Sequence, residues 1–275
     1  MEKIGNGTFV ILFELVENNT SRLASLARRI FMKLEILPIK TRKVLPPKDD
    51  ITDIIKHLPK LKQGDVLVIA SKVLAIHQGR CIKKSEIVNQ KSKIINQEAD
   101  YSLPMHNTAG SDIILTIKDH TLIPSAGIDE SNGNEYYILW PKNSSKEAKR
   151  IAGYLKKRDG IKNLGVIIAD SHTTPLRWGT QGISIGFFGL EPLKDYRGVK
   201  DIFGRKLKYT QTNIVDSLAN LAVLMMGEGK EQTPMVIIRG FKGLRFTNKD
   251  LHRKLVIDPK RDLYYPLLKI FKRRR

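Results

Sequence analysis

A chain of 275 residues is long enough for one large domain or two closely packed ones. Its 41% hydrophobic and 28% charged residues are typical of folded globular proteins, which excludes disordered and low-complexity classes. The single cysteine, Cys81, excludes an internal disulfide framework and a thiolate zinc site, so a cytoplasmic location is expected. No apolar run reaches the roughly 20 residues that a membrane span requires, and we expect no membrane contact.

The charge is unusual, because 48 basic residues against 28 acidic ones leave a net +20. Such an excess favours anionic partners such as nucleotides, nucleic acid or acidic metabolites. Residues 239–275 alone contain 13 basic and 3 acidic residues. We interpret the final basic run, 272–275, as a solvated tail, with a phosphate-binding arm that contacts RNA or the ribosome as the alternative.

Residues 1–31 read as a peripheral N-terminal extension, with an amphipathic segment on Leu23, Leu26, Ala27 and Ile30, because Met32 could itself begin a complete protein. We divide the rest softly into a main catalytic domain, 32–248, and a basic C-terminal tail, 249–275. Apolar runs predict strands at 33–39, 66–70, 165–169 and 235–239.

Helices alternate with these strands. Asp49 or Asp50 can cap a helix with an apolar face on Ile51, Ile54 and Ile55. The run 144–147 has the spacing of a capping box before a second helix. A third helix starts near residue 214 and ends at Gly227. The pattern predicts a mixed α/β (α+β) fold, with mixed β-sheets and flanking helices.

Standard catalytic motifs are missing or incomplete. The chain contains no phosphate-binding P-loop, no complete dinucleotide-binding Rossmann motif and no H-E-x-x-H zinc motif. Residues 182–186 match the nucleophile elbow around Ser184, but the following aromatics and helix breakers favour a strand interior. His172 lies two residues after Asp170, and we give it only a minor prospect of a direct role.

The acidic residues carry more information. Asp129 follows a glycine-bounded turn, Asp170 follows the strand at 165–169, and Glu228 follows Gly227. Sites in α/β proteins form at strand ends, and carboxylate and hydroxyl oxygens are the ligands that Mg²⁺ or Mn²⁺ prefers. From spacing alone, a metal site and a simple role in capping turns or pairing with arginines are equally supported.

Six motifs in order give the chain a recognisable pattern: GDVLVIASK at 64–72, AGIDESN at 126–132, GVIIADS at 165–171, KDYRG at 194–198, DIFGR at 201–205 and MGEG at 226–229. Together they resemble the gamma-glutamyl ligase family, which adds glutamate to the precursor of the deazaflavin coenzyme F(420). The resemblance runs from about residue 32 to about residue 240.

The resemblance implies a homodimeric ligase that uses GTP, or ATP, with Mg²⁺ or Mn²⁺ to join L-glutamate to a carboxylate acceptor through an acyl phosphate. Asp129 and Asp170 match the ligands of one metal ion, and Ser171 and Glu228 match those of a second. Arg177 is a further cation expected at the transferring phosphoryl group. The matching nucleotide contacts are Val44, Leu45, Ser71, Lys72, Asn132, Met226, Gly227 and Gly229.

Two departures from the family pattern bear on the substrates. Ile76, His77 and Gln78 stand where the family has a lysine and a glutamate, and Thr173 with Thr174 replaces a Gly-Arg pair. We therefore expect an anionic acceptor that can differ from the deazaflavin, either a small molecule or a protein C-terminus such as that of a ribosomal protein. The alternative from another class is a non-catalytic nucleotide- and RNA-binding protein on the same fold.

Overall fold

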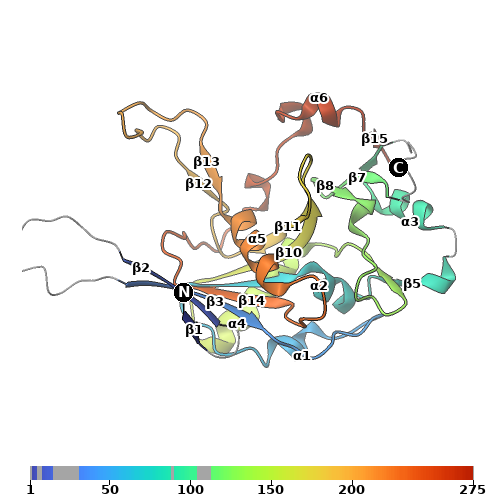
Figure 1. Ribbon diagram of the computed structural model, residues 1–275, viewed down its shortest axis with the longest axis horizontal. Coiled ribbons are helices and arrows are strands. Elements are labelled where there is room, and N and C mark those ends of the chain that lie inside the picture. The colour runs from blue at the N-terminus through green and yellow to red at the C-terminus, as the bar shows by residue number, and fades with distance from the viewer. Residues whose placement is uncertain (1, 5–7, 15–30, 88–89, 104–112, 275) are drawn as a thin grey trace, which may run out of the picture.

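The computed structural model describes residues 2–4, 8–14, 31–87, 90–103 and 113–274. Within them, a seven-stranded sheet runs in the order β1-β2-β3-β14-β4-β10-β11 (Figure 1). Its strands β4 and β10 are parallel, and every other neighbouring pair is antiparallel. The strands are β1 Glu2–Ile4, β2 Thr8–Glu14, β3 Phe31–Ile39, β4 Asp65–Ala70, β10 Leu164–Thr173, β11 Thr180–Phe188 and β14 Met235–Arg239.

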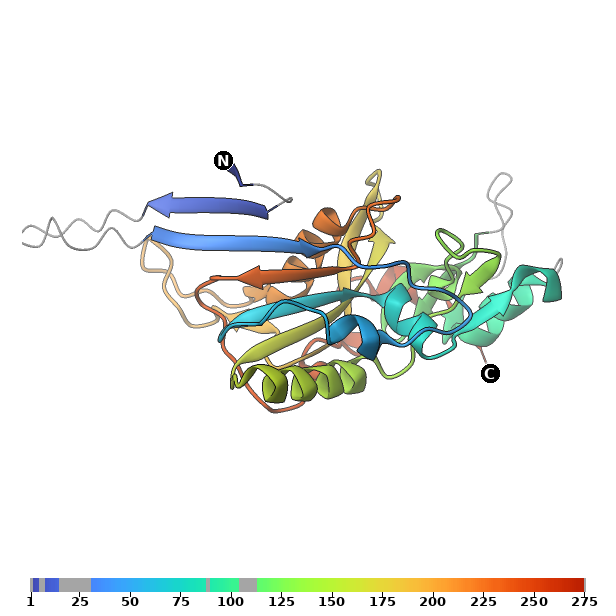
Figure 2. The same cartoon turned by 90° about the horizontal axis from the view of Figure 1, so that it is seen from below.

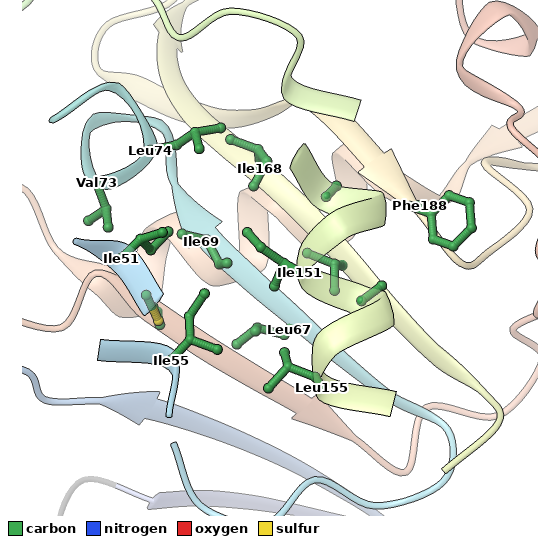
Figure 3. Close-up of a cluster of buried hydrophobic side chains, with 14 of the residues drawn as sticks. Ile51, Ile55, Leu67, Ile69, Val73, Leu74, Ile151, Leu155, Ile168 and Phe188 are labelled. Carbon is green, nitrogen blue, oxygen red and sulfur yellow. The ribbon is translucent and has the colours of Figure 1, made fainter. Parts of the chain in front are cut away.

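Helices cover both faces of this sheet, as Figure 2 shows. One face packs against α1 (Ile51–Ile55), α2 (Ser71–His77) and α4 (Ser144–Asp159), and the other packs against α5 (Ile214–Met226). Because both faces are buried, the central strands are continuous apolar runs instead of alternating ones. Figure 3 shows the first of the two cores, in which Leu67 and Ile69 of β4 meet Ile151 and Leu155 of α4.

Smaller sheets extend the molecule beyond the large one. A four-stranded sheet has the order β15-β6-β7-β8, and two ribbons consist of β5-β9 and β12-β13. Helix α3 (Lys91–Glu98) packs against this part of the molecule through Ile95, together with Ala99, which follows the helix. The strands of these smaller sheets are β5 Cys81–Lys83, β6 Tyr101–Ser102, β7 Leu115–Lys118, β8 Thr121–Pro124, β9 Tyr136–Ile138, β12 Leu193–Asp195, β13 Gln211–Asn213 and β15 Lys272–Arg273. The short helices of the chain are η1 Lys84–Glu86, η2 Ser125–Gly127, η3 His252–Lys254, η4 Pro259–Arg261 and α6 Tyr265–Leu268.

Most expected elements are confirmed. The mixed α/β class is confirmed, the Asp50 side chain caps α1 by accepting from Thr52 N, and Gly227 ends α5. Ser184 lies inside β11, as expected for a strand and not for a nucleophile elbow. The prediction of a capping box at 144–147 is wrong, because Asn143, in the left-handed conformation, precedes the helix and Ser144 is already its first residue.

Both ends of the described chain add strands. β2 pairs with β3 and β1 pairs with β2, so β1 forms one edge of the large sheet. The expected amphipathic segment at 23–30 lies outside the described residues. The basic C-terminal run pairs with β6 through β15, while the side chains of Lys272 and Arg273 are exposed. No helix among the described residues is long and apolar enough to cross a membrane.

Candidate active site

Three strands of the large sheet bring the site together at one edge. Because β4 and β10 are parallel, with Ala70 paired to Ala169, the residues that follow them emerge at the same edge. Ser71 and Lys72 therefore lie beside Asp170. The antiparallel strand β14 begins at this edge too, since Met235 pairs with Ile69. The loop 227–234 that leads into β14 thus closes the same side of the molecule.

A small pocket lies at this edge and contains both candidate metal-binding aspartates. Asp129 comes from the irregular segment between β8 and β9, and Asp170 from β10. The pocket joins them to the polar groups that follow β4 and to an apolar wall. Its lining residues are Ser71, Lys72, Gly127, Asp129, Ile138, Leu139, Trp140, Pro141 and Asp170.

The pKa values of the two carboxylates are shifted in opposite directions. Burial, aided by the nearby charge of Asp129, raises the pKa of Asp170 to about 7, although hydrogen bonds from Ser171 N and the Ser71 hydroxyl act in the opposite direction. Burial also raises the pKa of Asp129, but Lys72 and Ser131 outweigh it and leave that pKa below its ordinary value. Near neutral pH the pocket therefore holds one firmly ionised carboxylate and one close to its titration midpoint.

Asp129 owes its ionised state to short polar contacts. Its Oδ2 lies 2.7 Å from Lys72 Nζ, and its Oδ1 accepts from Ser131 N at 2.7 Å. Lys72 Nζ donates as well to the carbonyl oxygen of Ser131 at 2.7 Å. The ammonium group thus ties the start of α2 to the loop 129–132.

A turn of left-handed residues delivers Asp129 to the pocket. Ser125, Ala126 and Gly127 have φ angles of 51°, 54° and 71°, of which only the last is a glycine. Non-glycine residues in this region store strain and persist only when their surroundings impose it. The buried Thr116 hydroxyl accepts from Ala126 N at 2.8 Å and donates to Ile123 O, so it supplies part of that constraint.

Trp140 supplies the rest of the support. A Cβ built on Gly127 would lie 2.1 Å from its Cε3 atom, so the indole occupies the space that any side chain at 127 would need. Trp140 is only 2% exposed, and among the described residues its Nε1 is the one buried side-chain nitrogen or oxygen without a hydrogen-bond partner. The turn, the indole and the wall of the pocket therefore form one packed unit.

The loop 227–234 is joined to the Asp129 loop by Asn132, one of the residues expected to bind the nucleotide. Asn132 Nδ2 donates to Gly229 O at 3.1 Å. The loop is shaped by Glu231, which accepts from Gly229 N, and by Thr233, which donates to Met226 O. Lys72, Asn132 and the 226–229 segment, expected on a common nucleotide, thus lie in one chain of contacts.

Other candidate residues lie outside the pocket. Glu228 is exposed and accepts from Thr180 Oγ1 at 3.4 Å, and Arg177 is exposed between β10 and β11. Leu45 is 54% exposed in a loop that Asp49 ties to Arg42, while Val44 packs against the core. Ser171 follows Asp170 on β10 but does not line the pocket. The structure therefore unites the first expected ligand pair, and the second pair stays a prediction.

The side-chain atoms in the pocket indicate which kind of metal ion could bind there. The described residues contain no group of three or more His, Cys, Asp or Glu side chains arranged to hold a metal. What the pocket offers is two carboxylates and the Ser71 hydroxyl, all oxygen donors. Hard ions such as Mg²⁺ or Mn²⁺ keep several waters and bind through one or two carboxylates plus substrate phosphates. The residues present fit such an ion, and they do not fit zinc.

The residues that depart from the family pattern have structural partners here. His77 Nδ1 accepts from Ile51 N at 3.3 Å, and the Gln78 amide exchanges two 2.8 Å hydrogen bonds with the backbone of Lys142. His172 is partly buried near Asp216, and burial lowers its pKa. It does not line the pocket.

Sequence reasoning missed the supporting residues Thr116 and Trp140, and a lysine pair, Lys84 and Lys91, that binds Glu130 beside the site. Of the three left-handed residues at 125–127, only Gly127 is a residue type that indicates such a conformation in the sequence. The two lysines are indistinguishable, in the sequence, from the other 46 basic residues.

Comparisons with known proteins identify the family of this chain. The family model described as F420-0:Gamma-glutamyl ligase matches residues 38–240, which include both aspartates and the 227–234 loop. A coenzyme F420:L-glutamate ligase of Methanopyrus kandleri is 33% identical over 250 residues, which cover 84% of this chain and 97% of that protein.

Two further relatives carry the same description. That of Methanocaldococcus jannaschii is 34% identical over 203 residues, 70% of this chain and 81% of the relative. One from Methanococcus maripaludis is 34% identical over 239 residues, 81% of this chain and 95% of the relative. With the model match over most of its length, the chain belongs to the F420-0:gamma-glutamyl ligase family.

Proposed function

We propose that the protein is a ligase that joins L-glutamate in amide linkage to a carboxylate acceptor, using a nucleoside triphosphate and Mg²⁺ or Mn²⁺. The observation that carries the proposal is the pairing of Asp129 and Asp170 in one oxygen-lined pocket, next to Lys72 and the loop 227–234. Its relatives are named for L-glutamate and coenzyme F420, which sets the first acceptor to be tested.

The proposed reaction has two steps. The γ-phosphoryl group passes to an oxygen of the acceptor carboxylate, so a P–O bond to the nucleoside diphosphate breaks and an acyl phosphate forms. The glutamate amine then attacks the acyl carbon, an amide bond forms, and inorganic phosphate and a proton leave. A divalent ion in the pocket would neutralise the triphosphate and the charge that develops on the transferring group.

The chain's own residues position these groups. Asp129 is kept ionised and oriented by Lys72 and Ser131, so its negative charge is in place at the pocket to attract a cation. Lys72 is already anchored by the Ser131 carbonyl and presents its charge at the rim of the pocket. Asn132 holds the loop 227–234 beside the Asp129 loop, where it could contact a bound nucleotide.

GTP is the expected nucleotide, with ATP as the comparison. Purified protein is to be assayed with each nucleotide, Mg²⁺ or Mn²⁺, L-glutamate and the deazaflavin F(420)-0, with products read by mass spectrometry. The proposal predicts turnover that requires metal, nucleotide and glutamate, and that falls by more than about 100-fold in Asp170→Asn, because the pocket loses a charged ligand.

Omitting the deazaflavin tests the other acceptors. Glutamylation of a protein C-terminus would appear as a mass increase on added ribosomal protein. Nucleotide or salt-dependent RNA binding without turnover, unchanged in Asp170→Asn, would contradict the ligase proposal and favour the non-catalytic alternative.

We infer a homodimer from exposed apolar side chains on two projecting hairpins, β10-β11 and β12-β13 (Figure 1). Leu176 and Trp178 are fully exposed on the first, and Ile202 and Phe203 are 92% and 89% exposed on the second. Fully exposed large apolar residues indicate an interaction surface. Sedimentation equilibrium should give twice the chain mass, and Phe203→Asp with Trp178→Asp should shift it toward the monomer. A monomeric wild-type protein would contradict the inference.

A further inference from the structure

Beside the proposed metal pocket, two lysines from different elements converge on one carboxylate. Lys84 of η1 places its Nζ 3.1 Å from Glu130 Oε2, and Lys91, the first residue of α3, binds Glu130 Oε1. All three side chains are partly accessible, with exposed fractions of 36%, 28% and 40% for Lys84, Lys91 and Glu130. A dissolved anion can therefore reach the two ammonium groups.

An aromatic ring holds the lysine pair together. The two Nζ atoms lie 5.4 Å and 5.5 Å from the centre of the Tyr137 ring, on β9. The negative face of the ring attracts both ammonium groups and offsets part of their mutual repulsion. Two positive charges here meet one carboxylate, so the cluster keeps an excess positive charge that suits a carboxylate ligand.

The position of this cluster relates it to the chemistry. Asp129 and Glu130 are adjacent, yet Asp129 contacts Lys72 at the pocket and Glu130 contacts Lys84 and Lys91. Neighbouring residues on a chain are about 3.8 Å apart between Cα atoms. An anion on the lysine pair would therefore be held at the same loop that carries the pocket carboxylate Asp129.

We propose that Lys84 and Lys91 bind a carboxylate of the incoming L-glutamate, and that Glu130 fills their place until the substrate arrives. This rests on the proposed function for the identity of the substrate. Glu130 is itself a glutamate side chain, so its carboxylate offers the lysines the same contacts as the side-chain carboxylate of the substrate. Binding then exchanges one carboxylate for another on the two lysines, and the displaced Glu130 carboxylate, which is partly exposed, is solvated by water.

The proposed exchange predicts the direction in which a substitution of Glu130 changes the affinity for L-glutamate. If Glu130 competes with the substrate, Glu130→Gln should tighten L-glutamate binding by about two- to fivefold, the worth of a partly exposed ion pair. If Glu130 only braces the Asp129 loop, the same variant should weaken binding or leave it unchanged. Lys84→Met and Lys91→Met should each weaken it by about tenfold, because each removes a charge-assisted hydrogen bond to the ligand.

The experiment is equilibrium dialysis of radiolabelled L-glutamate against the full-length protein with Mg²⁺ and a non-hydrolysable nucleotide analogue, followed by the glutamate KM of each variant. Glu86→Gln and Lys93→Met are matched controls, because both residues are exposed on the same two elements, η1 and α3. Circular dichroism and the melting temperature show whether each variant is folded.

The outcomes separate this proposal from the proposed function. Tighter binding in Glu130→Gln with weaker binding in both lysine variants, and no change in the controls, supports the subsite. Unchanged or weaker binding in Glu130→Gln, or unchanged binding in folded lysine variants, overturns it even if the enzyme turns over normally. Absence of ligase turnover with intact, Lys84-dependent glutamate binding would instead contradict the proposed reaction and leave the subsite standing.

Discussion

The two aspartates of the pocket are positioned by contrasting parts of the molecule. Asp170 lies on β10, directly after the buried residues 164–169 that pair with β4, and is itself paired with β11. Asp129 follows an irregular turn that is held by one threonine hydroxyl, one indole and a lysine. The first position follows from sheet geometry alone, whereas the second depends on a few specific contacts. The difference teaches that the Asp129 side of the site is the more sensitive to substitutions that leave both aspartates intact.

The largest effect is expected at the turn. Gly127→Ala places a methyl group 2.1 Å from Trp140 Cε3 at a φ of +71°, so both the packing and the backbone resist it. We expect a loss of about 3 kcal/mol of unfolding free energy, from overpacking and backbone strain together, and a weaker metal affinity. Urea unfolding and Mn²⁺ titration measure the two effects.

Gly198→Ala is the matched control for this substitution. Its φ is +81°, but a Cβ there would meet nothing within 4 Å, so it isolates the backbone cost of about 1 kcal/mol. Equal losses in the two variants would show that Trp140 does not support the turn.

The second-largest effect is expected in the pH dependence of stability, which should differ between Asp170 and Asp129. Since burial raises the pKa of Asp170 to about 7, the folded state binds this proton more tightly than the unfolded state, whose Asp pKa is about 4. The metal-free protein therefore loses stability as the pH rises from about 4 to about 7. Asp170→Asn removes the ionisation and should gain on the order of 2 kcal/mol at pH 8, with a much smaller gain at pH 5.

Asp129 should behave in the opposite way. Its pKa is lowered overall because Lys72 and Ser131 outweigh burial, so its charge stabilises the folded state above the unfolded pKa, and this stability is lost as the pH falls. Asp129→Asn should therefore destabilise the protein at pH 8. Thermal unfolding in the presence of a chelator checks both variants, and shifts of the same sign would refute the electrostatic contrast.

The smallest effect is expected at Thr116. Thr116→Val keeps the shape of the side chain but leaves Ala126 N without its 2.8 Å hydrogen bond. We expect a loss of about 1 to 2 kcal/mol and a several-fold rise in the metal concentration needed for half-maximal turnover. Thr116→Ser restores the hydroxyl and should recover the metal dependence. A valine variant with normal metal dependence would show that the hydroxyl serves stability alone.

The sequence predicted the regular side of the site better than the irregular side. Asp170 could be found because it follows an uninterrupted apolar strand, and strands of that kind reveal themselves through local pattern. The helix starts were less certain: the expected capping box at 144–147 failed, because Asn143 provides the turn into α4 from a left-handed conformation. Tertiary packing determines such a left-handed backbone conformation, so the residue types alone give little indication of it.

The surroundings of Asp129 could not be predicted for a related reason. Its partners Lys72, Thr116 and Trp140 come from separate parts of the chain, and each is an ordinary residue in its own segment. Two of the turn's three left-handed positions are occupied by Ser125 and Ala126, which carry no turn signature. The resemblance to a family identified the aspartate; only the fold shows what holds it.

The central place of β14 has a consequence for how the chain folds. This strand is inserted between β3 and β4, which precede it by more than half of the sequence, and its residues 235–238 are fully buried. Until β14 is present, β3 and β4 lack a common neighbour, so the large sheet and both of its cores are incomplete. Such distant pairing slows folding. Cutting the chain within the loop 227–234 should therefore give fragments that acquire order only by recombining.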